Sequence, residues 1–232
     1  MKYSIGIDLG TTHTALSYVD LELAEGEEAP PTVFGIPQLV AQGAVDTRAL
    51  LPSFLYLPHP SEGAQPLPWD PARTYAVGEH ARARGSDAPG RVISSAKSWL
   101  CHQGVDRRAV ILPPTPAGAQ LEAELEKLSP VEVSRRYLSP LREAWNAKIG
   151  KDDPDGLFEK QEVVLTVPAS FDAAARDLTA EAARAAGIER LTLLEEPQAA
   201  LYSWIEQSHG KWRKQVKVGD VILVIDVGGG TT

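Results

Sequence analysis

Two segments near opposite ends of the chain follow the same design, and this pair constrains the fold more than any other feature. Each is a short apolar run that ends in aspartate and continues through one apolar residue into glycine and threonine, as IGIDLGTT at 5–12 and VIDVGGGT at 224–231. The apolar runs predict strands, and the glycines predict a tight turn after each strand. Because Asp8 and Asp226 are 218 positions apart, the two turns act together only if they meet across a cleft.

The residue types in these turns suit a phosphate ligand. Glycines let the backbone take positive φ and approach a ligand closely, so that successive N–H groups converge on phosphate oxygens, and threonine hydroxyls add further donors. The residues with these roles are Gly10, Thr11, Thr12 and His13 in the first turn and Gly228, Gly229, Gly230 and Thr231 in the second. Asp8 and Asp226 stand at the strand ends, where a carboxylate holds Mg²⁺ directly or through its waters. The pattern predicts a polyphosphate and Mg²⁺ held from both sides.

The first half of the chain is predicted to be irregular apart from its amino-terminal hairpin. Apolar and β-branched residues over 3–9 and 14–19, separated by a GTTH turn, predict that hairpin. Proline and glycine clusters make 25–71 a loop-rich region around one short strand at 53–57. Two further short elements are predicted, a helix over 92–100 and a strand over 109–112.

The second half alternates strands and helices more regularly. Ser129 and Glu132 flank a proline in the arrangement of a capping box and predict a helix to about residue 149, with a kink or break near Ser139 caused by Pro140. The other predicted elements are buried strands at 163–167 and 191–194, a last strand at 221–225, an alanine-rich helix capped by Asp172 and ended by Gly187, and a helix opened by Glu195-Glu196-Pro197 and closed by Gly210. This order implies a parallel layer with right-handed crossovers.

Composition excludes several classes of protein. With 23 Lys and Arg against 31 Asp and Glu, the net charge is −8, and the chain lacks the clustered basic residues of a nucleic-acid-binding surface. No run approaches the roughly 20 uncharged apolar residues of a membrane span, and no signal-peptide core follows Met1, so we expect a cytoplasmic protein that binds neither nucleic acid nor membrane. Cys101 is the single cysteine, and no Cys or His group has metal-ligand spacing, so we expect an ordinary, partly buried thiol.

These motifs resemble a known superfamily, the ATPases of actin, sugar kinases and heat-shock chaperones, which carry two phosphate loops of this form. Three details resemble the seventy-kilodalton heat-shock chaperones (DnaK type) in particular. The segment TVPASFD at 166–172 resembles the family's TVPAYF followed by Asn or Asp. The segment LEEPQAA at 194–200 resembles the family's NEPTAA, and GTTHT at 10–14 resembles its GTTNS. Bacterial rod-shape actins share the EEP and GGGTT motifs, but they have no large inserted subdomain, so the long separation of the two turns favours the chaperone branch.

The resemblance covers nearly the whole chain and implies an α/β fold. It implies one lobe of an actin-like (ribonuclease-H-like) ATPase, with a mixed sheet flanked by helices and a smaller inserted α+β subdomain. The implied division places 1–24 and 129–212 in the core of the first lobe, 25–128 in the divergent insertion and 213–232 at the start of a truncated second lobe. Because the chain stops inside the second phosphate turn, we expect 226–232 to be frayed, and this fragment to bind ATP weakly and hydrolyse it negligibly.

By the same resemblance, four residues act in catalysis. Glu196 positions or activates the attacking water, and the start of a helix favours its ionised form, although such a carboxylate also serves simply to satisfy N–H groups there. Lys97 aligns with the lysine that reaches the transferring phosphoryl group, although a lysine on a helix often just faces water. Asp226 and Thr231 complete the set from the second turn.

Five neighbouring positions carry further expectations. Pro168 and Arg176 resemble the pair that relays the nucleotide state to the chaperone's substrate domain, while Arg176 also fits a plain surface position. Ala180 replaces the family's lysine one turn further along, which weakens the case for an unmodified relay. His13 replaces an asparagine and either lines the turn or makes nucleotide binding depend on pH near neutrality. Glu195 inherits no family role and is expected to be a solvated charge.

The resemblance implies the amino-terminal part of an ATP-dependent chaperone of the heat-shock or stress-response type. With ATP or ADP and Mg²⁺ as cofactors, it would hydrolyse ATP by in-line attack of water on the γ-phosphate. Hydrolysis would control the binding of extended peptides by a carboxy-terminal domain outside this chain, with a co-chaperone and a nucleotide-exchange factor as partners. The alternative is an actin-like cytoskeletal or scaffold protein whose polymerisation depends on nucleotide. A small-molecule kinase is disfavoured because Glu196 takes the place of a water-directing residue.

Overall fold

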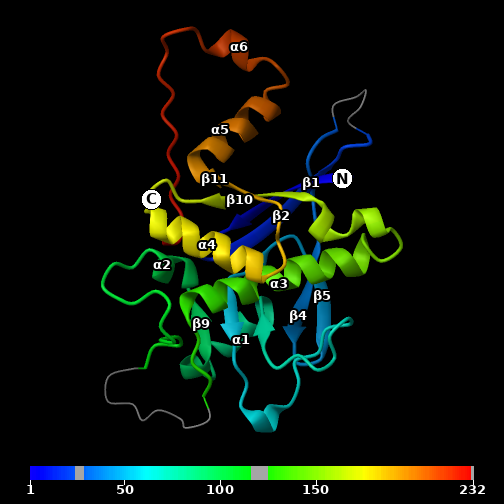
Figure 1. The fold of residues 1–232 in the computed structure, drawn as a ribbon, viewed down its shortest axis with the longest axis vertical. Coiled ribbons are helices and arrows are strands. Elements are labelled where there is room, and N and C mark those ends of the chain that lie inside the picture. Colours follow the sequence, from blue (N-terminus) through cyan, green and yellow to red (C-terminus); the bar gives the residue numbers. More distant parts are fainter. Residues whose placement is uncertain (24–28, 116–124, 231–232) are drawn as a thin grey trace.

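The computed structural model describes residues 1–23, 29–115 and 125–230, and a mixed sheet lies at its centre (Figure 1). Its strands run in the order β11-β10-β1-β2-β3, and β6 pairs with β2 beside that path. The bounds are β1 Tyr3–Leu9, β2 His13–Asp20, β3 Thr32–Val33, β6 Leu51–Pro52, β10 Glu162–Val167 and β11 Leu191–Glu195. The predicted hairpin is confirmed as the antiparallel pair β1 and β2, whereas β10 runs parallel to both β1 and β11.

Helices lie on both sides of this sheet, and those on one side are the more deeply buried. In Figure 1, α3 (Pro130–Lys148) and α4 (Ala173–Ala185) run along one face, and α5 (Glu196–Gln207) rises from the other, followed by α6 (Trp212–Gln215). The predicted alternation of β10, α4, β11 and α5 is confirmed, and Asp172 caps α4 by accepting a hydrogen bond from the N–H of Ala175 at 2.7 Å. The carboxyl ends of β1, β10 and β11 therefore point in one direction, toward the start of α5.

Smaller elements fill the region between β3 and α3. They are β4 Ile36–Ala41, β5 Ala44–Arg48, β7 Phe54–Tyr56, β8 Ala76–Val77, β9 Val92–Ser94, α1 Glu79–Arg84, α2 Ala96–Leu100, and the 3₁₀ turns Pro60–Glu62 and Pro89–Arg91. Two further 3₁₀ turns, Pro154–Gly156 and Phe158–Lys160, lie between α3 and β10. The mixed α/β architecture that we expected is therefore present.

The expectation of a single strand in the loop-rich region was wrong. Besides β7, this region holds β3, β6 and the hairpin of β4 and β5. The polar Gln38 hides the apolar character of β4 in the sequence, yet its side chain is 2 % exposed. Its Nε2 donates to the carbonyl of Leu50 at 2.8 Å, and its Oε1 accepts from the N–H of Glu79 at 2.9 Å. A buried polar side chain is tolerated when both of its ends are hydrogen-bonded in this way.

Helix α3 differs from its prediction at two points. Ser129 accepts a hydrogen bond from the N–H of Glu132 at 3.1 Å, but the Glu132 carboxylate pairs with Arg135 and Arg136 instead of completing the capping box. Of the kink or break predicted near Ser139, the break is absent, because the helix runs through Pro140 to Lys148. A proline removes one helical hydrogen bond, which the burial of the flanking turns offsets here.

Trp145 of α3 anchors this helix to the central sheet. Its ring is fully buried, and its Nε1 donates to the carbonyl of Gly156 at 2.8 Å. Four aromatic rings surround it, with centroids between 5.1 and 5.9 Å away: Tyr3, Tyr18, Phe34 and Phe158. Three of these contacts are edge-to-face, and the one with Phe34 is tilted. Such aromatic contacts add to the stability that apolar burial provides, so they fasten α3 to the strands.

Four other predictions need correction. The predicted helix over 92–100 is a strand, β9, followed by α2, and the predicted strand over 109–112 contributes one isolated bridge, between Leu112 and Leu128. The strand β11 is half-buried instead of buried. The segment 221–225 forms no strand: Val221 and Leu223 are 94 % and 80 % exposed, because no strand in the described part of the chain pairs with them.

One expectation about general character also has its outcome here. Cys101 is a free, partly buried thiol that donates to the carbonyl of Ser98 at 3.2 Å, as predicted. None of the helices in the described ranges is long and apolar enough to cross a membrane.

Candidate functional site

The two glycine turns come together around one open pocket of about 600 Å³, at the ends of β1 and β10 and the start of α5. Its lining comes from the β1–β2 turn, α2, β10, α5 and the last described segment of the chain. These residues are Asp8, Gly10, Thr11, Thr12, His13, Lys97, Thr166, Glu196, Ala199, Ala200, Ser203, Asp226, Gly228 and Gly229. The structure therefore brings together most of the residues named from the sequence, although they lie up to 221 positions apart.

The second turn touches the first directly. A Cβ atom added to Gly229 would overlap the side chain of Thr12, and one added to Gly230 would lie 2.7 Å from Cγ2 of Thr11. The absence of a side chain at both positions leaves room for the threonine side chains of the first turn to lie against the second turn. Thr231, which we also named from the sequence, lies outside the described residues.

The first turn is fastened by a serine that the sequence reading did not single out. Ser53 Oγ donates to the carbonyl of Gly10 at 2.8 Å and lies 3.1 Å from Thr14 Oγ1, while the Ser53 N–H donates to the carbonyl of Thr12 at 2.9 Å. These bonds hold the turn at both ends, with Thr11 buried and Thr12 exposed toward the pocket. His13 also lines the pocket, with Nδ1 3.3 Å from Thr12 Oγ1.

Three carboxylates face the pocket from three different elements. Asp8 is the last residue but one of β1 and accepts a hydrogen bond from Thr166 Oγ1 at 2.9 Å, which leaves its other oxygen unengaged in the described structure. Asp226 comes from the carboxy-terminal segment, and Glu196 is the first residue of α5. Thr166 is a second site residue that the sequence reading did not single out, because its role depends on the parallel pairing of β10 with β1.

Lys97 supplies a positive charge against these carboxylates. It lies on α2, is 5 % exposed, and forms an ion pair with the carboxylate of Glu196. Burial raises the pKa of Glu196 above its ordinary value and outweighs the opposing effect of Lys97, while the charges of Asp8 and Asp226 raise this pKa further. The helix start was expected to favour the ionised form of Glu196, but loss of solvent is the larger effect.

The donor set of the pocket fits a hydrated divalent cation. No group of three or more His, Cys, Asp or Glu side chains within 1–23, 29–115 and 125–230 is arranged to hold a metal ion alone. Asp8 and Asp226 nevertheless present hard oxygen ligands, and Mg²⁺ usually keeps several waters and uses one or two carboxylates plus phosphate oxygens. An anionic polyphosphate would also need such a cation beside three carboxylates and one lysine.

A second, smaller cavity of about 110 Å³ lies beside Glu196. Its walls are Pro168, Ala169, Ser170, Glu196, Pro197, Val224 and Asp226. Arg176, which we paired with Pro168 from the sequence, forms an ion pair with Glu195 at 2.6 Å. Glu195 is partly solvated, as expected, with 36 % of its side chain exposed, but it is also ion-paired. Ala180, where the family pattern has lysine, is 8 % exposed within α4.

Comparison with known proteins identifies the family. The model of the family described as Hsp70 protein matches residues 76–232. Curated relatives include the chaperone protein HscA of Cronobacter sakazakii, 34 % identical over 248 residues, and the chaperone protein HscA homolog of Methylococcus capsulatus, 31 % identical over 239 residues. Each match covers 99 % of this chain but only 32 % or 31 % of the relative.

The chain belongs to the Hsp70 family and corresponds to the amino-terminal part of its actin-like ATPase domain. The mixed sheet with helices on both faces agrees with that fold. The matches favour the chaperone branch over the cytoskeletal alternative. The chain spans about a third of the length of the curated relatives that it matches.

Proposed function

We propose that the protein is an ATP-dependent chaperone whose pocket binds ATP or ADP with Mg²⁺ and hydrolyses ATP. The observation that carries this proposal is the convergence of the two glycine turns, Lys97 and Glu196 on one pocket. Backbone N–H groups of glycine-rich turns bind phosphate oxygens, and the volume of about 600 Å³ lies within the range of small-molecule sites. Membership of the Hsp70 family supports the same function.

Each protein residue has one role in this proposal. Glu196 accepts a hydrogen bond from the attacking water and orients it toward the γ-phosphate, and Lys97 offsets negative charge on the phosphate oxygens. Thr11 and Thr12 donate their hydroxyls to phosphate oxygens, as does Thr231 from outside the described residues. Asp8 and Asp226 would hold Mg²⁺ through its waters, and when bound this ion supplies charge neutralisation of the phosphates.

The Lys97–Glu196 ion pair gives the proposal a specific first event. In the structure these two side chains neutralise each other, so neither is available to a nucleotide. Arrival of a triphosphate offers Lys97 a new anionic partner. The Glu196 carboxylate is then released to accept a hydrogen bond from water. Lys97 is a suitable group for this exchange because its ammonium is a compact charge on a flexible stem.

The remaining parts of the proposal concern the intact protein. Hydrolysis controls the binding of extended peptide segments by a carboxy-terminal domain, with a co-chaperone and a nucleotide-exchange factor as partners, in the cytoplasm and in response to stress. The chain divides as proposed from the sequence, into a first-lobe core at 1–24 and 129–212, an insertion at 25–128 and the start of a second lobe at 213–232.

ATP turnover by the full-length protein tests this function. We expect Glu196→Gln to lower kcat by about 10²-fold or more, because the water loses its acceptor, and Asp8→Asn to lower both turnover and the effect of added Mg²⁺. Glu181→Gln is a matched control, since Glu181 is an exposed carboxylate on α4 that pairs with Arg108 at 2.6 Å outside the pocket. Turnover that is unchanged in both site variants would refute the assignment of the catalytic centre.

A further inference from the structure

Arg176 joins the two backbone segments that flank Glu196. It lies in the first turns of α4, where its Nε donates to the carbonyl of Phe171 at 3.2 Å. Its Nη2 donates to Oε1 of Glu195 at 2.6 Å. Glu195 is the last residue of β11 and directly precedes Glu196, the first residue of α5. One guanidinium therefore connects the β10–α4 turn with the β11–α5 junction.

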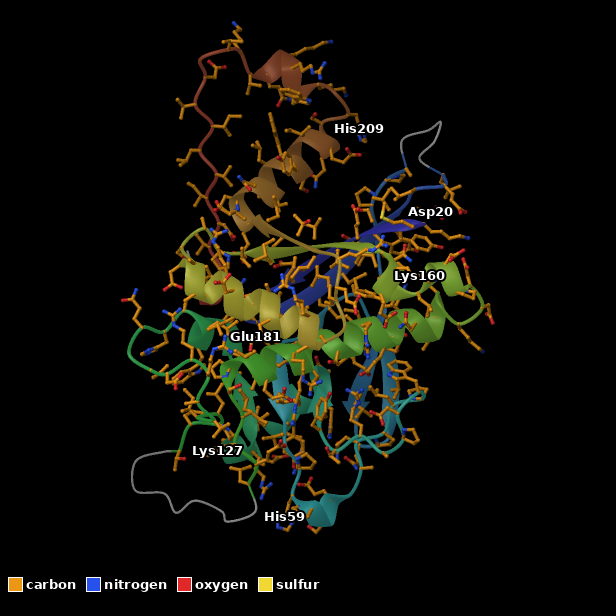
Figure 2. All side chains as sticks on the ribbon, viewed as in Figure 1. Asp20, His59, Lys127, Lys160, Glu181 and His209 are labelled. Carbon is orange, nitrogen blue, oxygen red and sulfur yellow. The ribbon has the colours of Figure 1, made fainter. Side chains whose placement is uncertain are left out.

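The start of α5 has few other anchors. This helix has no buried residue, and no side chain caps its amino terminus. Figure 2 shows His209, which follows α5, well away from the sheet, so the far end of the helix does not fix its beginning. The pair with Lys97 holds the side chain of Glu196 on the pocket side, but a nucleotide would compete for that lysine. Among the residues that the structure describes, the bond between Glu195 and Arg176 is the other charged contact at this junction.

Consecutive carboxylates at this junction point to different partners. Glu195 pairs with Arg176 on α4, whereas Glu196 pairs with Lys97 on α2. Because adjacent like charges repel, an engaged Glu195 keeps its own charge directed away from the pocket. The small cavity beside Glu196 is walled by Ala169 and Ser170, which belong to the same turn that Arg176 holds through Phe171. Arg176 thus contacts both the turn that carries this wall and the residue that precedes Glu196.

We propose that Glu195 and Arg176 form a positioning pair that holds the carboxylate of Glu196 in place once Lys97 has turned to a phosphate. Neither residue lines the nucleotide pocket, so the pair acts through Glu196 and not through nucleotide contacts. This inference rests on the proposed ATPase function, since positioning matters only if Glu196 orients a water. It assigns a role to Glu195, at the position where the family pattern has asparagine.

The test measures kcat and the Kd for ATP separately in the full-length protein. Glu195→Gln keeps the size of the side chain and removes its charge. We expect about a tenfold loss of kcat, which is less than the hundredfold that a displacement of 1 Å can cost, with the Kd for ATP within twofold of wild type. Arg176→Gln removes the same bond from the other side and should give a similar loss. The double variant should lose no more than the larger single loss, because one interaction is removed once.

Two controls separate positioning from a structural role. Glu181→Gln breaks the Arg108–Glu181 pair, which has the same 2.6 Å separation and also involves α4, and it should leave kcat unchanged. Glu181 is labelled in Figure 2 beside α4. The charge-exchanged variant Arg176→Glu with Glu195→Arg should recover most of the lost kcat. If it does not fold, the Gln variants and their double carry the test.

The outcomes are distinct. If the wild type hydrolyses ATP and both Gln variants have the same turnover as wild type, the positioning pair is refuted, but the proposed function is not. If the losses of kcat in the two single variants add up in the double variant, the positioning pair is also refuted, since the residues would then act independently. A wild-type protein that binds no ATP and shows no turnover refutes the proposed function itself, and the positioning role with it.

Discussion

Replacing Lys97 with methionine removes the positive charge that is paired with Glu196 in the described part of the chain. The side chains of Lys97 and Glu196 are 6 % and 15 % exposed, so water cannot substitute fully for the lost partner. Methionine keeps most of the length and apolar contact of the lysine stem. The variant therefore isolates one effect, a carboxylate left in a partly buried pocket that also contains Asp8 and Asp226.

The size of this effect has an upper limit set by proton uptake. Glu196 has an ordinary pKa of 4.5, and its folded-state pKa is already raised in the wild type. Without Lys97 the folded protein can always neutralise Glu196 by binding a proton. This costs about 1.36 kcal/mol for each unit by which the pH exceeds the pKa of Glu196 in the unfolded state. The penalty is therefore at most about 3.4 kcal/mol at pH 7 and about 0.7 kcal/mol at pH 5, and the first figure agrees with the 3–5 kcal/mol typical of a broken buried pair.

The sign of the pH dependence follows from the same argument. A carboxyl group with a raised pKa binds more protons in the folded state than in the unfolded state, so the unfolding free energy of Lys97→Met should fall relative to wild type as the pH rises from 5 to 7. Urea denaturation at pH 5, 6 and 7 measures this difference. Lys97→Met combined with Glu196→Gln should recover most of the loss at pH 7, because no charge is left unpaired. A penalty equal at pH 5 and pH 7 would contradict the reasoning.

Two further predictions concern the frame of the site. Asp172 caps α4 and accepts hydrogen bonds from Nη1 and Nη2 of Arg107, each at 2.9 Å. These bonds lower the pKa of Asp172 from 3.8 to about 2. The stabilisation by Asp172 should be complete at pH values above its unfolded-state pKa and should disappear as the pH falls through about 2. The melting temperature of Asp172→Asn should therefore be below that of wild type at pH 7 and converge with it near pH 2. Gly229→Ala should weaken ATP binding, measured by calorimetry, because its Cβ overlaps Thr12, whereas Gly90→Ala meets no atom within 4 Å and should bind ATP as wild type does.

The parts of the fold that were predictable are those whose signal is local. The strand at β10 follows from a continuous apolar run, and α4 follows from the Asp172 cap at one end and Gly187 at the other. Gly187 has φ +86°, a conformation that glycine adopts freely, so a glycine there marks the end of a helix. In each case neighbouring residues alone carry the information, which is why the elements were found with nearly correct bounds.

The errors arise where distant residues decide the structure. The strand β4 escaped prediction because Gln38 looks exposed until its partners Leu50 and Glu79 are known. The segment 221–225 has a strong strand sequence but lacks a paired neighbour among the described residues, and a strand needs such a neighbour for its backbone hydrogen bonds. Hydrogen bonding to a distant partner is not encoded in any local window of sequence.

The same distinction applies to the site. Its glycines, aspartates, Lys97 and Glu196 were found because their types and positions follow a known motif, and the structure places them around one pocket. Ser53 and Thr166 were missed because each acts through a hydrogen bond to a residue at least 39 positions away. The pairing of Glu195 with Arg176 was missed for the same reason, across 19 positions.

The buried ion pair indicates why this pocket is more than a by-product of folding. Replacing a buried ion pair with apolar residues of similar volume is often neutral or stabilising, so stability alone gives little reason to keep Lys97 and Glu196 inside. Burial also raises the pKa of Glu196 toward the range in which a carboxylate serves as a proton acceptor. Perturbed ionisable groups in a pocket are characteristic of functional sites, and here they meet between two turns suited to phosphate. The features that disfavour maximal stability are therefore the features that the proposed nucleotide-hydrolysing site requires.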